Sequence, residues 1–205
     1  PYLGRISGSR VLAGQIKRGD GQSIDAVIWF SDLRESTPLS SSLGEQRFLE
    51  LLNDYFLATA GAVLAHGGEV LRFIGDASLA VFPTTGLDAR AVCARAVDAA
   101  QAARIRVDAA NEARRAAGLP QFACGVGLHL GRVYYGNIGT PERLEFSVIG
   151  MAANQAARIE ALCKETGQDV VLSSAFVAGL GKPCRSLGSF ALRGVEAPEE
   201  VFALA

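Results

Sequence analysis

Two aspartates stand at the ends of two apolar segments of this chain. Asp32 closes the run Ala26-Val27-Ile28-Trp29-Phe30-Ser31, and Asp76 lies between the apolar runs 71–74 and 77–82. A carboxylate at the tip of a buried strand must meet a cation or water, because burial of its isolated charge is prohibitive. Two such groups on neighbouring strand tips form an oxygen-rich site for a hard divalent cation, which usually also meets substrate phosphates. The pair therefore points first to nucleotide chemistry.

The elements that must position these aspartates alternate between strand and helix patterns. Residues 24–30 form a continuous β-rich run, and apolar residues then recur at helical spacing from Phe48 to the Gly67-Gly68 stop. Two short apolar runs bracket Gly75-Asp76, as in a tight hairpin. The pattern continues with a long helix over 88–117, strands over 122–130, 133–138 and 145–149, a helix over 150–166, and short elements from residue 170. This order predicts an α+β fold with helices on one face of a sheet.

Composition and charge exclude several classes of function. The 205 residues are 20% charged and 49% hydrophobic, with a formal net charge of −1. That balance gives no electrostatic footprint for a nucleic-acid backbone or an anionic membrane, so we expect neither partner. No apolar run approaches the roughly 20 residues that span a bilayer. Four scattered cysteines lack the spacing of a zinc site and indicate buried thiols in a reducing compartment. The start at Pro1 suggests a piece of a longer protein.

Four segments occur in an order that resembles a known family. They are Ile28-Trp29-Phe30-Ser31-Asp32-Leu33-Arg34, Phe73-Ile74-Gly75-Asp76, the run from Gly125 to Val133, and the run from Phe146 to Arg158. Together they resemble the catalytic domain of class III adenylate/guanylate cyclases of the bacterial type, from about Ile24 to Leu204. The resemblance implies that family's fold, a ferredoxin-like or palm-like, antiparallel-rich sheet with helices on one face. It also implies one catalytic domain over 1–205, with 1–23 as a lead-in downstream of a missing regulatory region.

The resemblance gives the two aspartates a definite role. It implies two Mg²⁺ or Mn²⁺ ions per active site, held by Asp32 and Asp76 with the carbonyl of Leu33 as a further ligand. The backbone amides from Leu33 to Thr37, including that of Ser36, are expected to cradle the phosphates at a helix start, where N–H groups point outward without partners.

Further residues match family positions that act on the sugar and the phosphates. Asn154 and Arg158 lie four residues apart on one predicted helix and so share a face. The resemblance implies that Asn154 positions the ribose and that Arg158 neutralises charge on the α-phosphate, which suits a permanently charged guanidinium. Arg132 matches an arginine that contacts the terminal phosphates. Arg193 is a weaker phosphate candidate, because the family lysine of this region does not align cleanly here.

Two positions are expected to read the base. Arg72 stands where many adenylate cyclases have Lys, and Ser147 stands where they have Asp, Thr or Ser. A cation can donate to adenine N1, and the serine hydroxyl can accept from the exocyclic amine. Guanine carries a donor at N1, so Arg72 would leave two donors facing each other, at a cost of about 1–3 kcal/mol. The sequence therefore favours ATP over GTP.

The leading hypothesis is a cytoplasmic adenylate cyclase, a lyase that converts ATP to 3′,5′-cyclic AMP and pyrophosphate. The resemblance implies a homodimer with shared active sites, and any membrane anchor would lie upstream of this domain. The alternatives are a silent or weak nucleotide-binding regulatory domain and a guanylate cyclase. A diguanylate cyclase is disfavoured, because its Gly-Gly-Asp/Glu-Glu-Phe hairpin is replaced by Phe73-Ile74-Gly75-Asp76-Ala77.

Overall fold

The computed structural model of the chain describes residues 8, 14, 17, 19–140, 142–195 and 197–204. The lead-in expected over 1–23 lies largely outside these residues, and its last three residues belong to the first strand. The helices and strands, in chain order, are β1 (Gly21–Leu33), α2 (Ser36–Leu43), α3 (Glu45–Ala65), β2 (Glu69–Ile74), β3 (Ala77–Pro83), α4 (Ala89–Ala116), β4 (Cys124–Thr140), β5 (Arg143–Ile149), α5 (Met151–Thr166), β6 (Val170–Ser173), α6 (Ser174–Leu180), β7 (Arg185–Phe190) and β8 (Glu199–Ala203).

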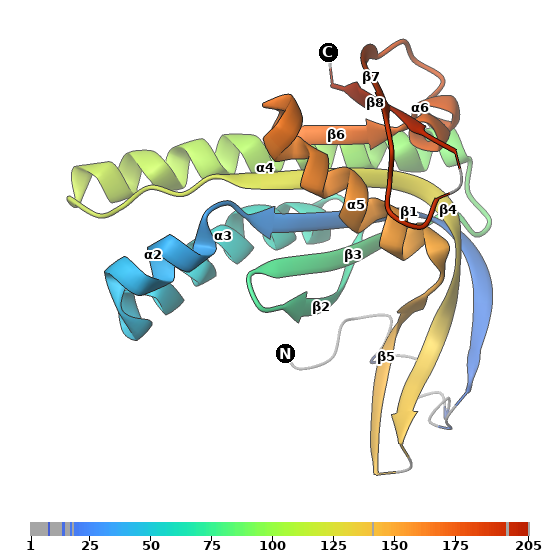
Figure 1. The fold of residues 1–205 in the computed structure, drawn as a ribbon. Coiled ribbons are helices and arrows are strands. Elements are labelled where there is room, and N and C mark those ends of the chain that lie inside the picture. Colours follow the sequence, from blue (N-terminus) through green and yellow to red (C-terminus); the bar gives the residue numbers. More distant parts are fainter. Residues whose placement is uncertain are drawn as a thin grey trace.

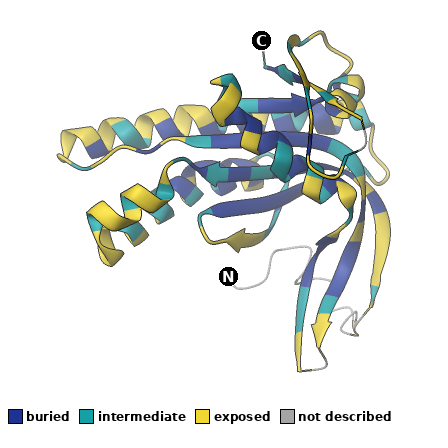
Figure 2. Ribbon diagram, viewed as in Figure 1, coloured by how far each residue is buried: buried dark blue, intermediate teal, exposed yellow. Residues whose placement is uncertain are grey.

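One eight-stranded sheet organises the molecule (Figure 1). Its strands run in the order β2-β3-β1-β4-β6-β8-β7, and β5 pairs with the far part of β4. Every pairing is antiparallel except that of β4 with β6. Figure 2 shows that the central strands are buried, whereas α2 is largely exposed. The predicted α+β fold with an antiparallel-rich sheet is confirmed.

The helices cover both faces of the sheet, which differs from the expected one-sided arrangement. Val27 and Trp29 of β1 pack in a core cluster with residues of α3, α4 and α6. The alternate residues Ala26 and Ile28 pack in a second cluster that includes Ala152 of α5. Successive side chains of a strand point to opposite faces, and all four of these β1 residues are fully buried. The unbroken apolar run of β1 therefore indicates a strand that is covered on both sides. Figure 1 shows α5 on one side of the sheet and α4 on the other.

Two other predicted features take a different form in the structure. Strand β4 is continuous through Gly131-Arg132, because both residues keep their pairing with β1. Helix α3 is long and apolar enough, by length and composition, to cross a membrane, although the sequence analysis found no such run. Leu51, Tyr55 and Val63 of α3 are fully buried within the protein core. One face of α3 therefore packs into the protein core, whereas Leu49, Leu57 and Leu64 of the same helix are exposed.

Candidate active site

The two aspartates meet at one edge of the sheet. Asp32 is the penultimate residue of β1 and is paired with Ala77, the first residue of β3, while Asp76 occupies the turn before it. The turn is possible because Gly75 adopts a φ of 62°, a left-handed conformation that favours glycine. The Leu33 N–H donates to the Asp76 carbonyl oxygen at 3.3 Å, which ties the strand tip to the hairpin. Burial and the neighbouring charge of Asp76 raise the pKa of Asp32.

A cavity of about 680 Å³ opens beside this carboxylate pair, and Asp32, Leu33 and Glu35 line part of it. Helix α2 begins next to it, and its N-cap residue Glu35, at φ 56°, makes no side-chain capping bond. The amides of Leu33 and Arg34 donate to the carbonyl oxygens of Asp76 and Ala123. These two N–H groups are therefore already hydrogen-bonded. Of the backbone amides expected to bind phosphate, those in the first turn of α2, which contains Ser36 and Thr37, remain as candidates.

A third carboxylate, which the sequence analysis missed, lies on the same side of the sheet. Glu160 of α5 is only 8% exposed and lines the same cavity. It fits because Gly125 has no side chain: a Cβ at that position would lie 2.2 Å from Glu160 Oε1. Burial, and next the charge of Asp32, raise the pKa of Glu160 to about 7, with a further increase from Asp76 and an opposing effect of Arg34.

The two base-reading candidates lie together, and Arg72 also lies near the aspartate pair of its own chain, because it pairs with Leu79, two residues along β3 from the partner of Asp32. Arg72 of β2 forms an ion pair with Glu145 of β5, and Ser147 lies two residues further along that strand. Ser147 pairs with Gly136, whereas Asp32 pairs with Gly125, eleven residues earlier on β4. At about 3.3 Å per residue, this is a strand path of roughly 36 Å. Glu145 was missed by the sequence analysis, although its spacing from Ser147 places both on one strand face.

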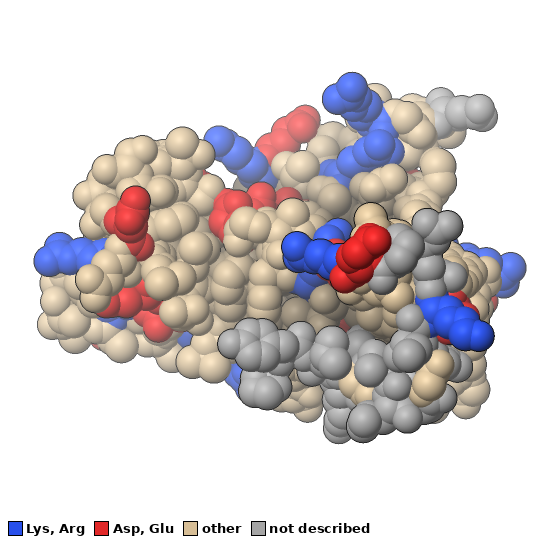
Figure 3. Space-filling view, turned by 90° about the horizontal axis from the view of Figure 1, so that it is seen from below, with Lys and Arg blue, Asp and Glu red and all other residues tan. Residues whose placement is uncertain are grey.

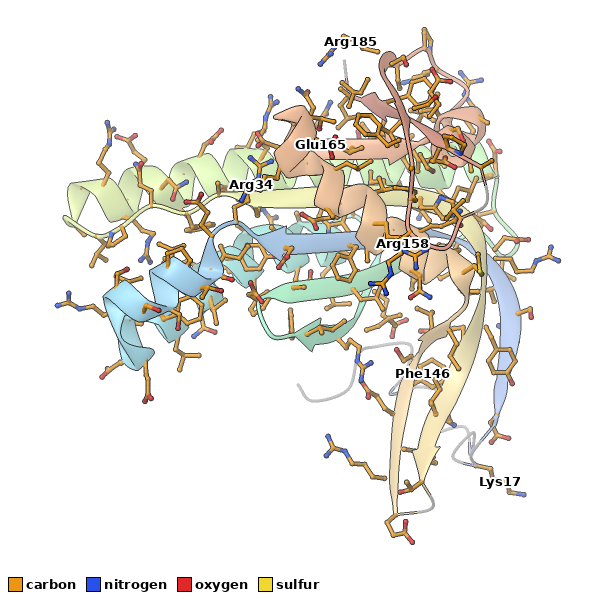
Figure 4. All side chains as sticks on the ribbon, in the orientation of Figure 1. Lys17, Arg34, Phe146, Arg158, Glu165 and Arg185 are labelled. Carbon is orange, nitrogen blue, oxygen red and sulfur yellow. The ribbon has the colours of Figure 1, made fainter. Side chains whose placement is uncertain are left out.

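The two helix residues lie on the outer side of α5. Asn154 is exposed, whereas Ala156 and Ile159 of the same helix are fully buried. The Arg158 guanidinium lies beside the loop after β7, within 3.6 Å of the position that a Cβ on Gly194 would occupy. Arg193 precedes that glycine, so the structure brings these two arginine positions to one region of the surface. Figure 4 labels Arg158 on α5 and Arg34 beyond the end of β1.

Arg132 is placed apart from both groups. Its guanidinium donates to both carboxylate oxygens of Asp25, from Nε at 3.0 Å and from a terminal nitrogen at 3.2 Å. The hydrogen bond from Arg132 lowers the pKa of Asp25. Asp25 and Asp32 are seven positions apart on β1, which is a path of about 23 Å at roughly 3.3 Å per residue. The structure therefore does not bring Arg132 to the aspartate pair of its own chain.

The donor set at the sheet edge suits a hard divalent cation. Two adjoining carboxylates repel each other, and a cation between them removes that repulsion. Within the part of the chain that the structure describes, no group of three or more His, Cys, Asp or Glu side chains is arranged to hold a metal. A cation on Asp32 and Asp76 would thus need backbone, water or substrate oxygens to complete its coordination, which Mg²⁺ commonly accepts.

The α+β fold and the paired strand-tip aspartates define a domain suited to metal-assisted nucleotide chemistry. Residues 20–203 match the adenylate and guanylate cyclase catalytic domain. The chain belongs to this family, which confirms the resemblance found in the sequence.

Individual relatives agree with this assignment. The chain is 34% identical over 154 residues to adenylate cyclase 1 of Rhizobium meliloti (strain 1021), covering 75% of this chain but only 23% of that protein. The structure of the adenylyl cyclase CyaB from P. aeruginosa superposes with a TM-score of 0.81 at 24% identity, over 90% of this chain and 95% of that one. The guanylyl cyclase Cya2 superposes at 0.78 with 26% identity, over the same shares of the two chains. Because an adenylyl cyclase and a guanylyl cyclase both share this fold, structural similarity alone does not identify which nucleotide this chain uses.

Proposed function

We propose that this domain is an adenylate cyclase that converts ATP to 3′,5′-cyclic AMP and pyrophosphate. The observation that carries the proposal is the contact between the Asp32 strand tip and the Asp76 hairpin, beside the uncapped start of α2. Asp32 and Asp76 would hold two Mg²⁺ or Mn²⁺ ions, with the Leu33 carbonyl as an additional ligand. When bound, these ions lower the pKa of the ribose 3′ hydroxyl and neutralise charge on the departing pyrophosphate.

The chain's own groups hold the rest of the substrate. The amides in the first turn of α2, at Ser36 and Thr37, bind phosphate oxygens, because the first N–H groups of a helix lack intrahelical partners. Asn154 orients the ribose, and Arg158 stabilises charge that develops on the α-phosphate. Arg193 contacts the phosphates from the neighbouring loop.

Base choice falls to Arg72 and Ser147. The Arg72 guanidinium has five donors, so its ion pair with Glu145 leaves others for adenine N1. Guanine would present its N1 donor to that cation, which disfavours GTP. Arg132 reaches the terminal phosphates in this proposal only after its exposed bidentate pair with Asp25 separates.

We further propose that two copies of the chain form a homodimer with shared active sites. Ser147 pairs with Gly136, eleven residues along β4 from the partner of Asp32, and this separation favours completion of each site by a second copy. Large apolar side chains are exposed beside the base-reading group, at Phe73, Ile74 and Met151. Exposed apolar patches commonly mark interaction surfaces, and a twofold pair would complete two equivalent sites.

Other partners are not part of the proposal. Acidic and basic residues are interspersed on the face drawn in Figure 3, in keeping with a formal net charge of −1. This distribution favours neither nucleic acid nor direct membrane contact. We place the reaction in the cytoplasm, where free thiols persist, because all four cysteines are free.

The test is product formation by the purified domain with ATP or GTP, in the presence of Mg²⁺ or Mn²⁺, with identification of products by mass. We expect cyclic AMP and pyrophosphate from the wild type. The Asp76→Asn variant should lose activity by orders of magnitude while remaining folded, because it loses a charged metal ligand. Cyclic GMP as the main product would overturn the base assignment. A folded wild type without product would favour a silent regulatory domain.

A further inference from the structure

We propose that Glu160 is an outer-sphere anchor for the divalent cation at Asp32, accepting hydrogen bonds from water bound to that cation. This inference rests on the proposed metal site. It extends the site to a residue on α5 of the same chain, and it assigns Glu160 as a positioning residue rather than as a direct ligand.

The register of the sheet brings Glu160 to Asp32. Asp32 and Gly125 are directly paired across β1 and β4, so their side-chain positions point to the same face. Cβ positions of such pairs lie about 4.5–5.5 Å apart. Because Glu160 Oε1 lies 2.2 Å from the Cβ position of Gly125, it lies over the strand position next to Asp32.

The helix is held at this position by close backbone packing. A Cβ on Gly127 would lie 2.5 Å from the Ala156 carbonyl oxygen and 2.5 Å from the Glu160 N–H nitrogen. The absence of side chains at Gly125 and Gly127 therefore lets α5 approach β4 closely. This contact fixes the Glu160 backbone relative to the strand that pairs with Asp32.

Glu160 has the properties of an unfilled acceptor. Its side chain is about nine-tenths buried, and no described residue forms a hydrogen bond or ion pair with it, so its carboxylate oxygens face the open cavity that it lines. Arg34 is the basic group that lowers the pKa of Glu160; its terminal nitrogen donates to the Gln168 carbonyl at 2.5 Å and lies 3.5 Å from Asp169, and its buried Nε has no hydrogen-bond partner among the described residues. Lys164 lines the same cavity but is exposed. A buried carboxylate without a partner is costly, and a hydrated cation would satisfy it.

An outer-sphere position agrees with the geometry. Glu160 does not form a three-carboxylate metal group with the two aspartates among the described residues. Mg²⁺ dehydrates reluctantly and keeps several waters at about 2.1 Å, and each water can donate to an acceptor about 2.7 Å further away. Outer-shell partners of this kind typically change metal affinity or activity by about 10–100-fold when removed.

The experiment measures Mn²⁺ binding without turnover. The folded protein is titrated with Mn²⁺ in the presence of α,β-methylene ATP, which cannot release pyrophosphate, and free Mn²⁺ is followed by electron paramagnetic resonance. Glu160→Gln keeps the shape of the side chain and removes its charge, and we expect about tenfold weaker Mn²⁺ binding. Glu165→Gln is the matched control, because Glu165 is an exposed residue of the same helix, and its affinity should stay within about twofold of wild type.

A second variant separates charge from packing. Glu160→Asp retains the charge and shortens the side chain, so it should bind Mn²⁺ more tightly than Glu160→Gln. Equal Mn²⁺ affinity in wild type and Glu160→Gln, or equal losses in the Asp and Gln variants, would overturn the inference. A wild type that makes cyclic AMP but shows such equality contradicts this inference alone. A wild type without cyclase activity, in which Glu160→Gln still binds Mn²⁺ more weakly than Glu165→Gln, contradicts the proposed function alone.

Discussion

Replacement of Glu160 by Gln should stabilise the metal-free protein at alkaline pH and leave it unchanged at acidic pH. Burial raises the pKa of this carboxyl from 4.5 to about 7 in the folded chain. Between these values the folded state binds more protons than the unfolded state, so the free energy of unfolding of wild type falls as the pH rises. Below 4.5 both states are protonated at this position, and Glu160 imposes no penalty.

The size of the effect follows from the two pKa values. At about 1.4 kcal/mol per pKa unit, the difference between 4.5 and about 7 corresponds to roughly 3 kcal/mol at pH 8. The carboxylate lines a cavity open to water, so we expect the measured difference to be about 1–3 kcal/mol. Gln cannot ionise and escapes this penalty while filling nearly the same volume.

The assay is urea unfolding of wild type and Glu160→Gln in EDTA, at intervals between pH 4.5 and 8. The difference in free energy of unfolding should grow across this range and then level off. Glu165→Gln should show no comparable trend, because its side chain is exposed. A difference between wild type and Glu160→Gln that does not vary with pH would refute the reasoning, since it would mean that Glu160 ionises as easily in the folded chain as in the unfolded one.

Two further outcomes test the composite site and the base pocket. Asp32→Ala and Asn154→Ala proteins should each be nearly inactive alone. Mixing them should restore about a quarter of wild-type activity, because half of the randomly formed dimers are mixed and each mixed dimer has one intact site of two. No recovery despite subunit exchange would place the whole site within one chain. Glu145→Gln should change the KM for ATP by about two- to fivefold with little change in kcat, because a half-exposed ion pair with Arg72 contributes up to about 1 kcal/mol. An unchanged KM for both ATP and GTP would remove Glu145 from base recognition.

The position of the aspartate pair could be predicted because its signals are local. A glycine followed by an aspartate between two β-rich runs predicts a hairpin, and the run ending at Asp32 predicts a strand tip. Pairing of β1 with β3 then brings the two together, as the register of Asp32 with Ala77 shows. The sequence was therefore sufficient to predict that the two candidate metal ligands lie together, although their role in metal binding stays a prediction.

The covering of the sheet could not be predicted in the same way. Helical periodicity identifies the apolar side of α5, but it does not state which face of the sheet that side will meet. The face depends on the path of the chain from β5 into α5, a property of the tertiary fold. The fully buried run from Ala26 to Trp29 did carry a signal, because a strand exposed on one face would alternate with polar residues.

The sequence does contain a signal for Glu160, although it was not used above. It stands beside Ile159 and four residues after Ala156, at a core-facing position of a helix that is otherwise apolar on that side. A charged residue in such a place is rarely buried without a partner, so it warrants a functional explanation. No comparable signal exists for Arg132. Neither its residue type nor its motif indicated that it would donate to Asp25 on the neighbouring strand β1.

The glycines of β4 connect packing to the proposed chemistry. Gly125 and Gly127 were quoted only as parts of a family motif, yet the structure gives each a steric reason: any side chain there would overlap Glu160 or the α5 backbone. The same close approach fixes the helix that carries Asn154 and Arg158 relative to the strand beside Asp32. In a homodimer, that helix would serve the partner's nucleotide through its outer residues and its own chain's cation through Glu160. A shift of α5 along β4 would therefore move residues of both sites, because the same helix contributes to each.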